Sequence, residues 1–214
     1  MLGEMLQNVR ENRPLVHCIT NYVTANDCAN LLLACGGSAI MADEMEEVEE
    51  VTSLCGGLVL NLGTPNPRKV EAMLRAGREA NRMGRPVVFD PVGVGCSAFR
   101  REASSRILEQ VQLSVIRGNA SEIAALTGGE AGRCGVDADA SAASAEKSAR
   151  LLAKKTGAVV VASGATDLVT DGEALYCVHN GHPMMRTVTG TGCQLSALTG
   201  AYVAANPQNL LRAA

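Results

Sequence analysis

Short apolar runs alternate along this chain with longer segments whose apolar residues recur at helical spacing. The runs are rich in β-branched residues and almost free of charge, which is typical of strands buried on both faces of a parallel sheet. They cover residues 15–19, 38–41, 57–62, 86–90, 113–117 and 158–162. Residues 22–35 and 66–83 predict amphipathic helices, and in the second the basic residues 68, 69, 75, 78 and 82 fall largely on one side. The alternation predicts an α/β fold with a mostly parallel sheet.

Several further elements complete this pattern. Residues 1–13, 142–155 and 194–203 predict additional helices. Asp171-Gly172 separates the strand-like runs 167–170 and 173–178, which predicts an antiparallel hairpin with a two-residue type I′ turn. Residues 130–145, rich in Gly, Ala, Ser and Asp, predict a mobile loop that opens the helix after it. We expect one domain over residues 1–214, because neither a repeat nor a linker interrupts the pattern.

The composition narrows the class of protein. With 47% apolar and 19% charged residues, the 214-residue chain can build a large core and is not a disordered segment. Its 19 basic and 22 acidic residues are scattered and give a net charge of −3, so we expect no nucleic-acid partner and no membrane partner. The eight cysteines contain no C-x-x-C pair, so we expect reduced thiols and a cytoplasmic location.

The glycine-rich segment before the last predicted helix is the strongest candidate for an anion site. Gly190, Thr191 and Gly192 directly precede Cys193 at the start of that helix. Helix-terminal amides left uncovered by glycine bind phosphate, and the same position makes a cysteine thiolate more available. The alternative is a glycine-rich cap needed only for close packing, with a buried and inert cysteine.

Polar residues also follow several of the predicted strands. Asp90 ends one run, Arg117 ends the next, and Glu122 lies shortly after it. Because the carboxyl ends of parallel strands meet at the ligand crevice, Arg117 could bind a phosphate and Glu122 could hold Mg²⁺ directly or through water. The alternatives are structural: Asp90 as a turn residue, and Asn119 with Glu122 as a helix capping box.

Two further strand ends carry candidate substrate contacts. Asn21 could orient a substrate hydroxyl group. Met41 could form an apolar wall for a small ring, although a methionine at such a position is more often part of the core. The three histidines do not have ligand spacing with the cysteines, so the sequence predicts no zinc site.

Five motifs occur in series: PLVHCITNYV at residues 14–23, DPVGVG at 90–95, VIRGNASEIA at 115–124, HNGHP at 179–183 and VTGTGC at 188–193. Together they resemble the hydroxyethylthiazole kinase family, and the match runs in order from about Pro14 to about Tyr202. The resemblance implies a ribokinase-like fold, a three-layer α/β/α sandwich, in homotrimers with the substrate site at subunit contacts. It also implies ATP-dependent phosphorylation of the primary hydroxyl group of 4-methyl-5-(2-hydroxyethyl)thiazole, with Mg²⁺, for thiamine synthesis.

The resemblance also implies roles for individual residues. By position, Met41 and Gly190 would contact the thiazole, and Asn21 would be a further substrate contact. Arg117 and Ser163 would contact ATP. Asp90 and Glu122 would lie in the Mg²⁺ region. Cys193 would be the catalytic residue, because related sugar and pyrimidine kinases usually have an aspartate general base there.

The chain departs from the family in one respect, and three other hypotheses of its function stay open. The sequence ends at Ala214, whereas family members usually continue into helices that help to wall the nucleotide pocket, so we expect this to bear on ATP affinity and stability more than on the fold. The protein could also phosphorylate another heterocyclic alcohol, such as a pyrimidine. It could be an acyl-transfer enzyme with Cys193 as its nucleophile, or a thiazole- or nucleotide-binding protein without turnover.

Overall fold

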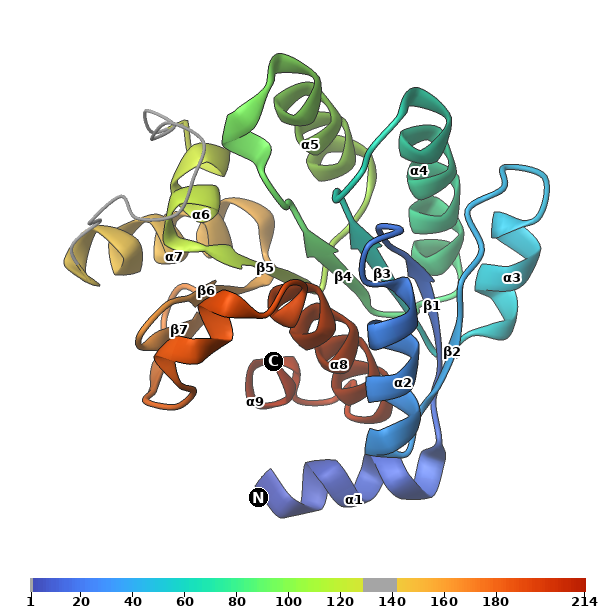
Figure 1. Cartoon of the computed structure of the whole chain (residues 1–214), viewed down its shortest axis with the longest axis horizontal. Coiled ribbons are helices and arrows are strands. Elements are labelled where there is room, and N and C mark those ends of the chain that lie inside the picture. Colours follow the sequence, from blue (N-terminus) through green and yellow to red (C-terminus); the bar gives the residue numbers. More distant parts are fainter. Residues whose placement is uncertain (1, 129–141) are drawn as a thin grey trace.

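The computed structural model describes residues 2–128 and 142–214, which build one eight-stranded sheet (Figure 1). The strand order is β2-β1-β3-β4-β5-β6-β7-β8. The first six strands are parallel, and β7 and β8 continue the sheet as an antiparallel hairpin. The strands are β1 Leu15–Ile19, β2 Ser38–Ile40, β3 Gly57–Asn61, β4 Val87–Asp90, β5 Val115–Asn119, β6 Val159–Ser163, β7 Asp167–Thr170 and β8 Leu175–Val178. The predicted mostly parallel sheet with a hairpin toward the C-terminal part is confirmed.

Helices cover both faces of this sheet. They are α1 Leu2–Asn12, α2 Ala25–Cys35, α3 Val48–Leu54, α4 Pro67–Arg82, α5 Ala98–Gln110, α6 Ala120–Leu126, α7 Ala142–Thr156, α8 Thr191–Ala205 and α9 Leu210–Ala213, with short 3-10 helices at Val94–Cys96 (η1) and Pro183–Thr187 (η2). Leu58 and Leu60 pack in one core with α4 to α7, whereas Val59 packs in a second core with α1, α2 and α8. This alternation along a strand is what the predicted three-layer sandwich requires.

The hairpin turn differs from the predicted type I′ turn. Thr170 pairs with Leu175, so residues 171–174 form a four-residue connection and Glu173 is not in the strand. The Asp171 carboxylate accepts the backbone N–H groups of Glu173 and Ala174, at 3.0 and 2.8 Å. These bonds stabilise the longer turn, which the Asp-Gly dipeptide alone does not reveal.

Helix α4 corrects a second expectation. Periodicity assigned Lys69 to the basic side of this helix, but its side chain is only 2% exposed. The reason is position: Lys69 lies in the first turn of α4, at the carboxyl edge of the sheet, where loops from the neighbouring strands fold over it.

The predicted capping box of Asn119 and Glu122 at the start of α6 is confirmed.

Three other expectations concern the cysteines, the loop and the membrane. Six of the eight cysteines are free, as expected, whereas Cys96 is disulfide-bonded. Most of the predicted mobile loop at 130–145 lies outside the described residues, and its last part belongs to α7. Within residues 2–128 and 142–214, no helix is both long enough and apolar enough to span a bilayer.

The strand order determines where a ligand can bind. The chain passes from β1 outward to β2 and then back across to β3, so the direction of winding reverses between β1 and β3. Loops diverge at such a point and leave a crevice at the carboxyl edge. Helix α8 packs against β1, β3 and β4 and begins at this same edge (Figure 1).

Candidate functional site

Buried polar side chains from β1, β3 and β4 form a row at the carboxyl edge of the sheet. The Asn21 amide, just beyond β1, donates from Nδ2 to Oδ1 of Asn61 at the end of β3, at 3.1 Å. Asn61 in turn donates from Nδ2 to Oδ2 of Asp90 at the end of β4, at 3.0 Å. The parallel register aligns Asn61 with Asp90, so this row follows directly from the strand pairing.

The start of α8 closes this row into a ring. Asn21 Nδ2 also donates to Sγ of Cys193, at 3.2 Å. Arg117 donates from Nη1 to the carbonyl oxygen of Gly192, at 2.8 Å. Its Nη1 lies 3.9 Å from Asp90 Oδ2, which returns the network to the sheet. We call Asn21, Asn61, Asp90, Arg117 and the segment Gly192–Cys193 the edge ring.

Arg117 is the cation of the edge ring and is almost completely buried. Besides Gly192, it donates from Nη2 to the hydroxyl group of Ser163, at 3.1 Å. The structure therefore brings together Arg117 and Ser163, the two predicted ATP contacts. Arg117 Nε is a buried donor without a hydrogen-bond partner. A buried unpaired donor is unfavourable unless a ligand or water supplies the acceptor, so this atom points to an anion beside the edge ring.

Asp90 is also buried, and its environment changes its titration. Burial raises the pKa of Asp90 to about 6, because the charged carboxylate loses its hydration; the nearby Arg117 charge and the Ser196 hydroxyl oppose this rise. Ser196 Oγ, on α8, donates to Asp90 Oδ2 at 2.6 Å. The side chain therefore lies close to a cation and two neutral donors, yet remains easier to protonate than an exposed aspartate.

Glu122 lies against the loop that follows Asp90. Its Oε1 accepts the backbone N–H of Gly93 at 2.9 Å, and its Oε2 accepts that of Asn119 at 2.8 Å. Its charge contributes to the raised pKa of Asp90, so the two predicted Mg²⁺ carboxylates are electrostatically coupled. Glu122 thus performs the capping role, and its part in holding Mg²⁺ stays a prediction.

Gly190 explains why glycine is required before α8. Its φ angle is +80°, and a Cβ there would lie 2.2 Å from Cγ2 of Thr24. Thr24 donates to Asn21 Oδ1 from both its backbone N–H and its hydroxyl group, each at 3.1 Å. Close packing of Gly190 on Thr24 therefore keeps the first amides of α8 next to Asn21, and those amides have no intrahelical partner. Both alternatives for the glycine segment, packing and anion binding, are compatible with this geometry.

Some predicted residues lie apart from the edge ring. Met41 follows β2, one of the two edge strands of the sheet, and is 37% exposed. The histidines have partners elsewhere: His17 with Thr52 and Ala42, and His179 with Thr166. His182 accepts the N–H of Met184. An acyl-transfer enzyme needs a base beside Cys193, and the partner of Cys193 is instead the Asn21 amide.

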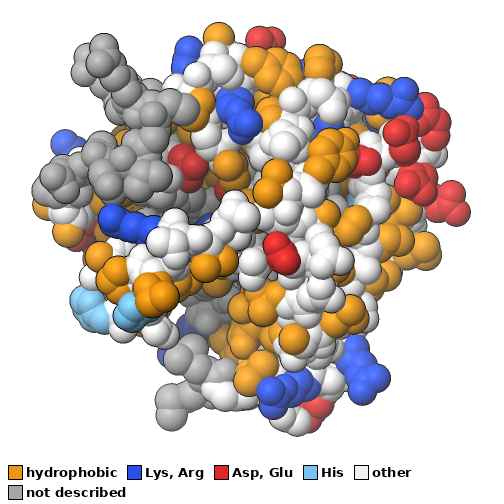
Figure 2. All heavy atoms as spheres, in the orientation of Figure 1, with side chains coloured by type: hydrophobic (Ala, Val, Ile, Leu, Met, Phe, Trp, Pro, Cys, Tyr) orange, Lys and Arg blue, Asp and Glu red, His pale blue; other side chains and the backbone are white. Residues whose placement is uncertain are grey.

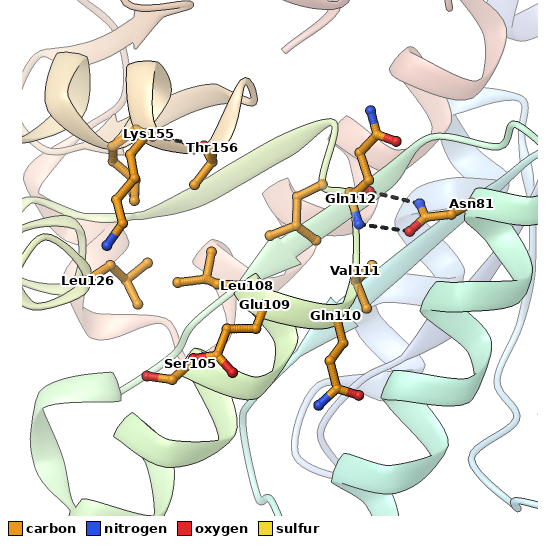
Figure 3. Close-up of a pocket in the computed structure, with 12 residues that line it drawn as sticks. Asn81, Ser105, Leu108, Glu109, Gln110, Val111, Gln112, Leu126, Lys155 and Thr156 are labelled. Atoms are coloured by element: carbon orange, nitrogen blue, oxygen red, sulfur yellow. Dashed lines mark hydrogen bonds between the residues drawn. The ribbon is translucent and has the colours of Figure 1, made fainter.

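One cavity in the described part of the chain does not coincide with the edge ring. It has a volume of about 540 Å³ and lies among the segments that enter β4, β5 and β6, at the amino edge of the sheet (Figure 3). Its lining includes Leu108, Leu126 and Lys155, and none of the predicted site residues. Ligands of open parallel sheets bind at the other edge, so we do not assign the site to this cavity.

Two residues of the site were missed in the sequence. Asn61 ends an apolar run in the same way as Asp90, and that shared position was a usable signal. Ser196 gives no such signal, because it lies within a helix and acquires its role only when that side of α8 packs over Asp90.

Comparison with known proteins identifies similar sequences and structures. The model of the hydroxyethylthiazole kinase family matches residues 6–214. A hydroxyethylthiazole kinase from Clostridium acetobutylicum is 50% identical over all of this chain and 81% of its own length. The structure of a hydroxyethylthiazole kinase from Pyrococcus horikoshii has a TM-score of 0.90 at 41% identity, covering 99% of this chain and 79% of that one. A ribokinase-like superfamily protein from Enterococcus faecalis, with a TM-score of 0.64 at 12% identity over 95% of this chain and 76% of that one, shares the fold alone.

Proposed function

The chain belongs to the hydroxyethylthiazole kinase family, and from this premise we propose that it transfers the γ-phosphate of ATP to the primary hydroxyl group of 4-methyl-5-(2-hydroxyethyl)thiazole. This reaction places it in thiamine metabolism. The observation that carries the proposal is the edge ring, in which Asn21 on one side and Arg117 on the other meet at the start of α8. An acceptor and a phosphate donor need such adjacent sites.

The phosphate side of the proposed site consists of Arg117, Ser163 and the first amides of α8. Phosphoryl transfer depends mainly on positioning and on stabilising negative charge. Arg117 supplies a fixed positive charge and one unpartnered donor, Nε. Gly190 has no side chain to cover the amides of Thr191, Gly192 and Cys193, which would face the transferred phosphoryl group.

Asp90 and Glu122 fit a magnesium ion that accompanies ATP. Each presents carboxylate oxygens, which are the hard donors that Mg²⁺ prefers, and a nearby cation would offset the unfavourable burial of the Asp90 charge. Among the described residues no group of three or more acidic, histidine or cysteine side chains could hold a metal. A Mg²⁺ ion typically needs only one or two carboxylates when phosphates and waters supply its other ligands. When bound, it would neutralise charge on the phosphates.

Cys193 would serve as the proton acceptor. The Asn21 amide donates to Sγ, so the sulfur accepts hydrogen bonds and is oriented toward the acceptor side of the edge ring. In the proposed step the substrate oxygen bonds to the γ-phosphorus, the bond from that phosphorus to the leaving oxygen of ADP breaks, and the hydroxyl proton moves to the Cys193 thiolate. Met41, Gly190 and Asn21 would contact the thiazole alcohol.

We also propose a homotrimer with the site at subunit contacts, and a cytoplasmic location. Large apolar side chains are exposed around the carboxyl edge, namely Tyr22, Val23, Met41 and Val188, and Leu33 is exposed in the last turn of α2. Figure 2 shows hydrophobic side chains at the surface over α2 and near η2, on the face that carries α8. A second copy of the chain would cover them and complete the wall beside Met41. A monomer measured by light scattering at assay concentrations would contradict this assembly.

The activity is tested by ADP release with MgATP and three acceptor conditions: hydroxyethylthiazole, a pyrimidine alcohol and no acceptor. The expected result is ADP release that depends on hydroxyethylthiazole. Faster ADP release with the pyrimidine alcohol would instead identify the pyrimidine as the substrate. Cys193→Ser should lower kcat by about 10²-fold, because a general base contributes on this scale, and should leave the KM for the thiazole alcohol nearly unchanged. A large rise in that KM with normal kcat would show that Cys193 binds substrate and does not act as the base.

A further inference from the structure

Lys69 is a buried lysine whose ammonium group joins two loops beside the proposed acceptor site. Its side chain is 2% exposed, although lysine is rarely buried without partners. Nζ donates to the carbonyl oxygen of Thr20 at 2.8 Å and lies 3.2 Å from Oδ2 of Asp43. It also lies 4.1 Å from the ring centroid of Tyr22. An ammonium group has three N–H donors, and these three contacts account for them.

The loops that Lys69 joins carry the two predicted contacts to the thiazole alcohol. Thr20 and Tyr22 flank Asn21 in the loop after β1. Asp43 lies two residues after Met41, in the loop after β2. Lys69 itself is held in the first turn of α4, where the Asn66 side chain accepts its backbone N–H at 2.9 Å. The ammonium group is therefore a fixed point to which both loops are attached.

Burial explains why these contacts determine one arrangement of the loops. A buried charge that loses its partners incurs a large desolvation cost, so loop positions in which Nζ has no acceptor are strongly disfavoured. Within one copy of the chain Tyr22 is 70% exposed, and its ring lies against the ammonium group of Lys69. Charge pairing with Asp43 restrains one loop, and the Thr20 carbonyl and the Tyr22 ring restrain the other.

We propose that Lys69 is a positioning residue for the acceptor alcohol, which sets the distance between Asn21 and Met41 by joining the loops that carry them. This inference rests on the proposed function and extends it. Lys69 lies apart from the phosphate side, whose groups come from β5, β6 and α8. Its loss should therefore affect the acceptor much more than ATP.

The test uses Lys69→Met in the full chain, which keeps a stem of similar length and removes the charge. We expect the KM for hydroxyethylthiazole to rise about tenfold, because loss of correct positioning costs on this scale, while the KM for MgATP stays within about twofold. Titration calorimetry with the thiazole alcohol should show the same weakening. An unchanged acceptor KM, or a fall in kcat alone, would overturn the proposal.

Arg68→Met is the matched control. Arg68 is the neighbouring residue on α4 and pairs with Glu44 and Glu46 of the same loop, but this cluster is exposed. Exposed pairs contribute little, so its kinetics should equal those of the wild type. An equal rise in acceptor KM for Arg68→Met would mean that any loss of charge on this helix has the effect, and would overturn a specific role for Lys69.

Two other variants keep the proposal testable if Lys69→Met does not fold. Asp43→Ala and Tyr22→Leu each remove one partner from a partly or largely exposed position. Each should raise the acceptor KM, by a smaller factor than Lys69→Met, with thermal melting as the check on folding. Unchanged acceptor KM values in both variants would overturn the proposal. Absence of thiazole-dependent ADP release by the wild type would instead refute the proposed function itself.

Discussion

Asp90 should make the stability of this protein fall as the pH rises between 3.8 and about 6. Its carboxyl group has a pKa of about 6 in the folded protein against an ordinary value of 3.8, mainly because of burial. Between these values the folded chain keeps a proton that the unfolded chain has lost, so the free energy of unfolding decreases with pH. Asp90→Asn removes this titration. The variant should therefore become more stable relative to the wild type as the pH rises.

The magnitude follows from the size of the shift. A rise from 3.8 to about 6 corresponds to about 3 kcal/mol in total, at about 1.4 kcal/mol per pH unit. By the linkage relation, about half of this total falls between pH 5 and pH 7.5. In a chain of this length that difference corresponds to about 3 to 6 °C in Tm. Altered bonds to Ser196 and Asn61 add an offset that is the same at both pH values, and the pH-dependent part carries the test.

The assay is urea unfolding followed by circular dichroism at pH 5 and at pH 7.5. A chelator is present so that no metal binds Asp90. Asp171→Asn is the control. Bonds from the Ala174 and Glu173 backbone lower the pKa of Asp171, so this group is ionised in both states across the window. Its difference from the wild type should stay constant between the two pH values. An equally constant difference for Asp90→Asn would refute the argument that burial raises the pKa of Asp90.

Two further substitutions test close approaches that only glycine permits. Gly190→Ala would place a Cβ 2.2 Å from Cγ2 of Thr24 at a φ of +80°, so we expect a lower Tm and kcat/KM; Thr24→Ser, which removes Cγ2, should restore part of both. Gly200→Ala would place a Cβ 2.5 Å from Cγ2 of Val59 and should destabilise the protein by about 1–3 kcal/mol in urea unfolding. Gly3→Ala is the control, because a Cβ at Gly3 would meet only open space. Equal stability of Gly200→Ala and Gly3→Ala would contradict the packing argument.

The strands could be predicted because burial on both faces leaves a simple pattern. All six apolar runs correspond to strands to within two residues. The errors occur where side chains determine the backbone locally. Asp171 accepts two N–H groups and lengthens the hairpin turn, and Lys69 is drawn inward by three partners from other segments. Neither effect changes the hydrophobic period from which the elements were predicted.

The site could be predicted only as far as strand ends indicate it. Asn21, Asp90 and Arg117 all follow or end predicted strands, and the structure joins them in the edge ring. Which residues join them depends on register and helix packing. Asn61 lies opposite Asp90 because β3 and β4 pair in a particular alignment. Ser196 reaches Asp90 only because α8 packs over β4, which no local pattern encodes.

The hydrogen bonds of the edge ring show which of its groups remain for a ligand. Asn21 uses both hydrogens of Nδ2, one on Asn61 and one on Cys193, and its Oδ1 accepts two donors from Thr24. Asn61 accepts from Asn21 and donates to Asp90. A buried network that is satisfied in this way is rigid. Within residues 2–128 and 142–214 the one buried side-chain donor without a partner is Arg117 Nε. The unmet demand for an acceptor therefore lies on the side of the ring assigned to ATP, next to a helix start whose amides also require one.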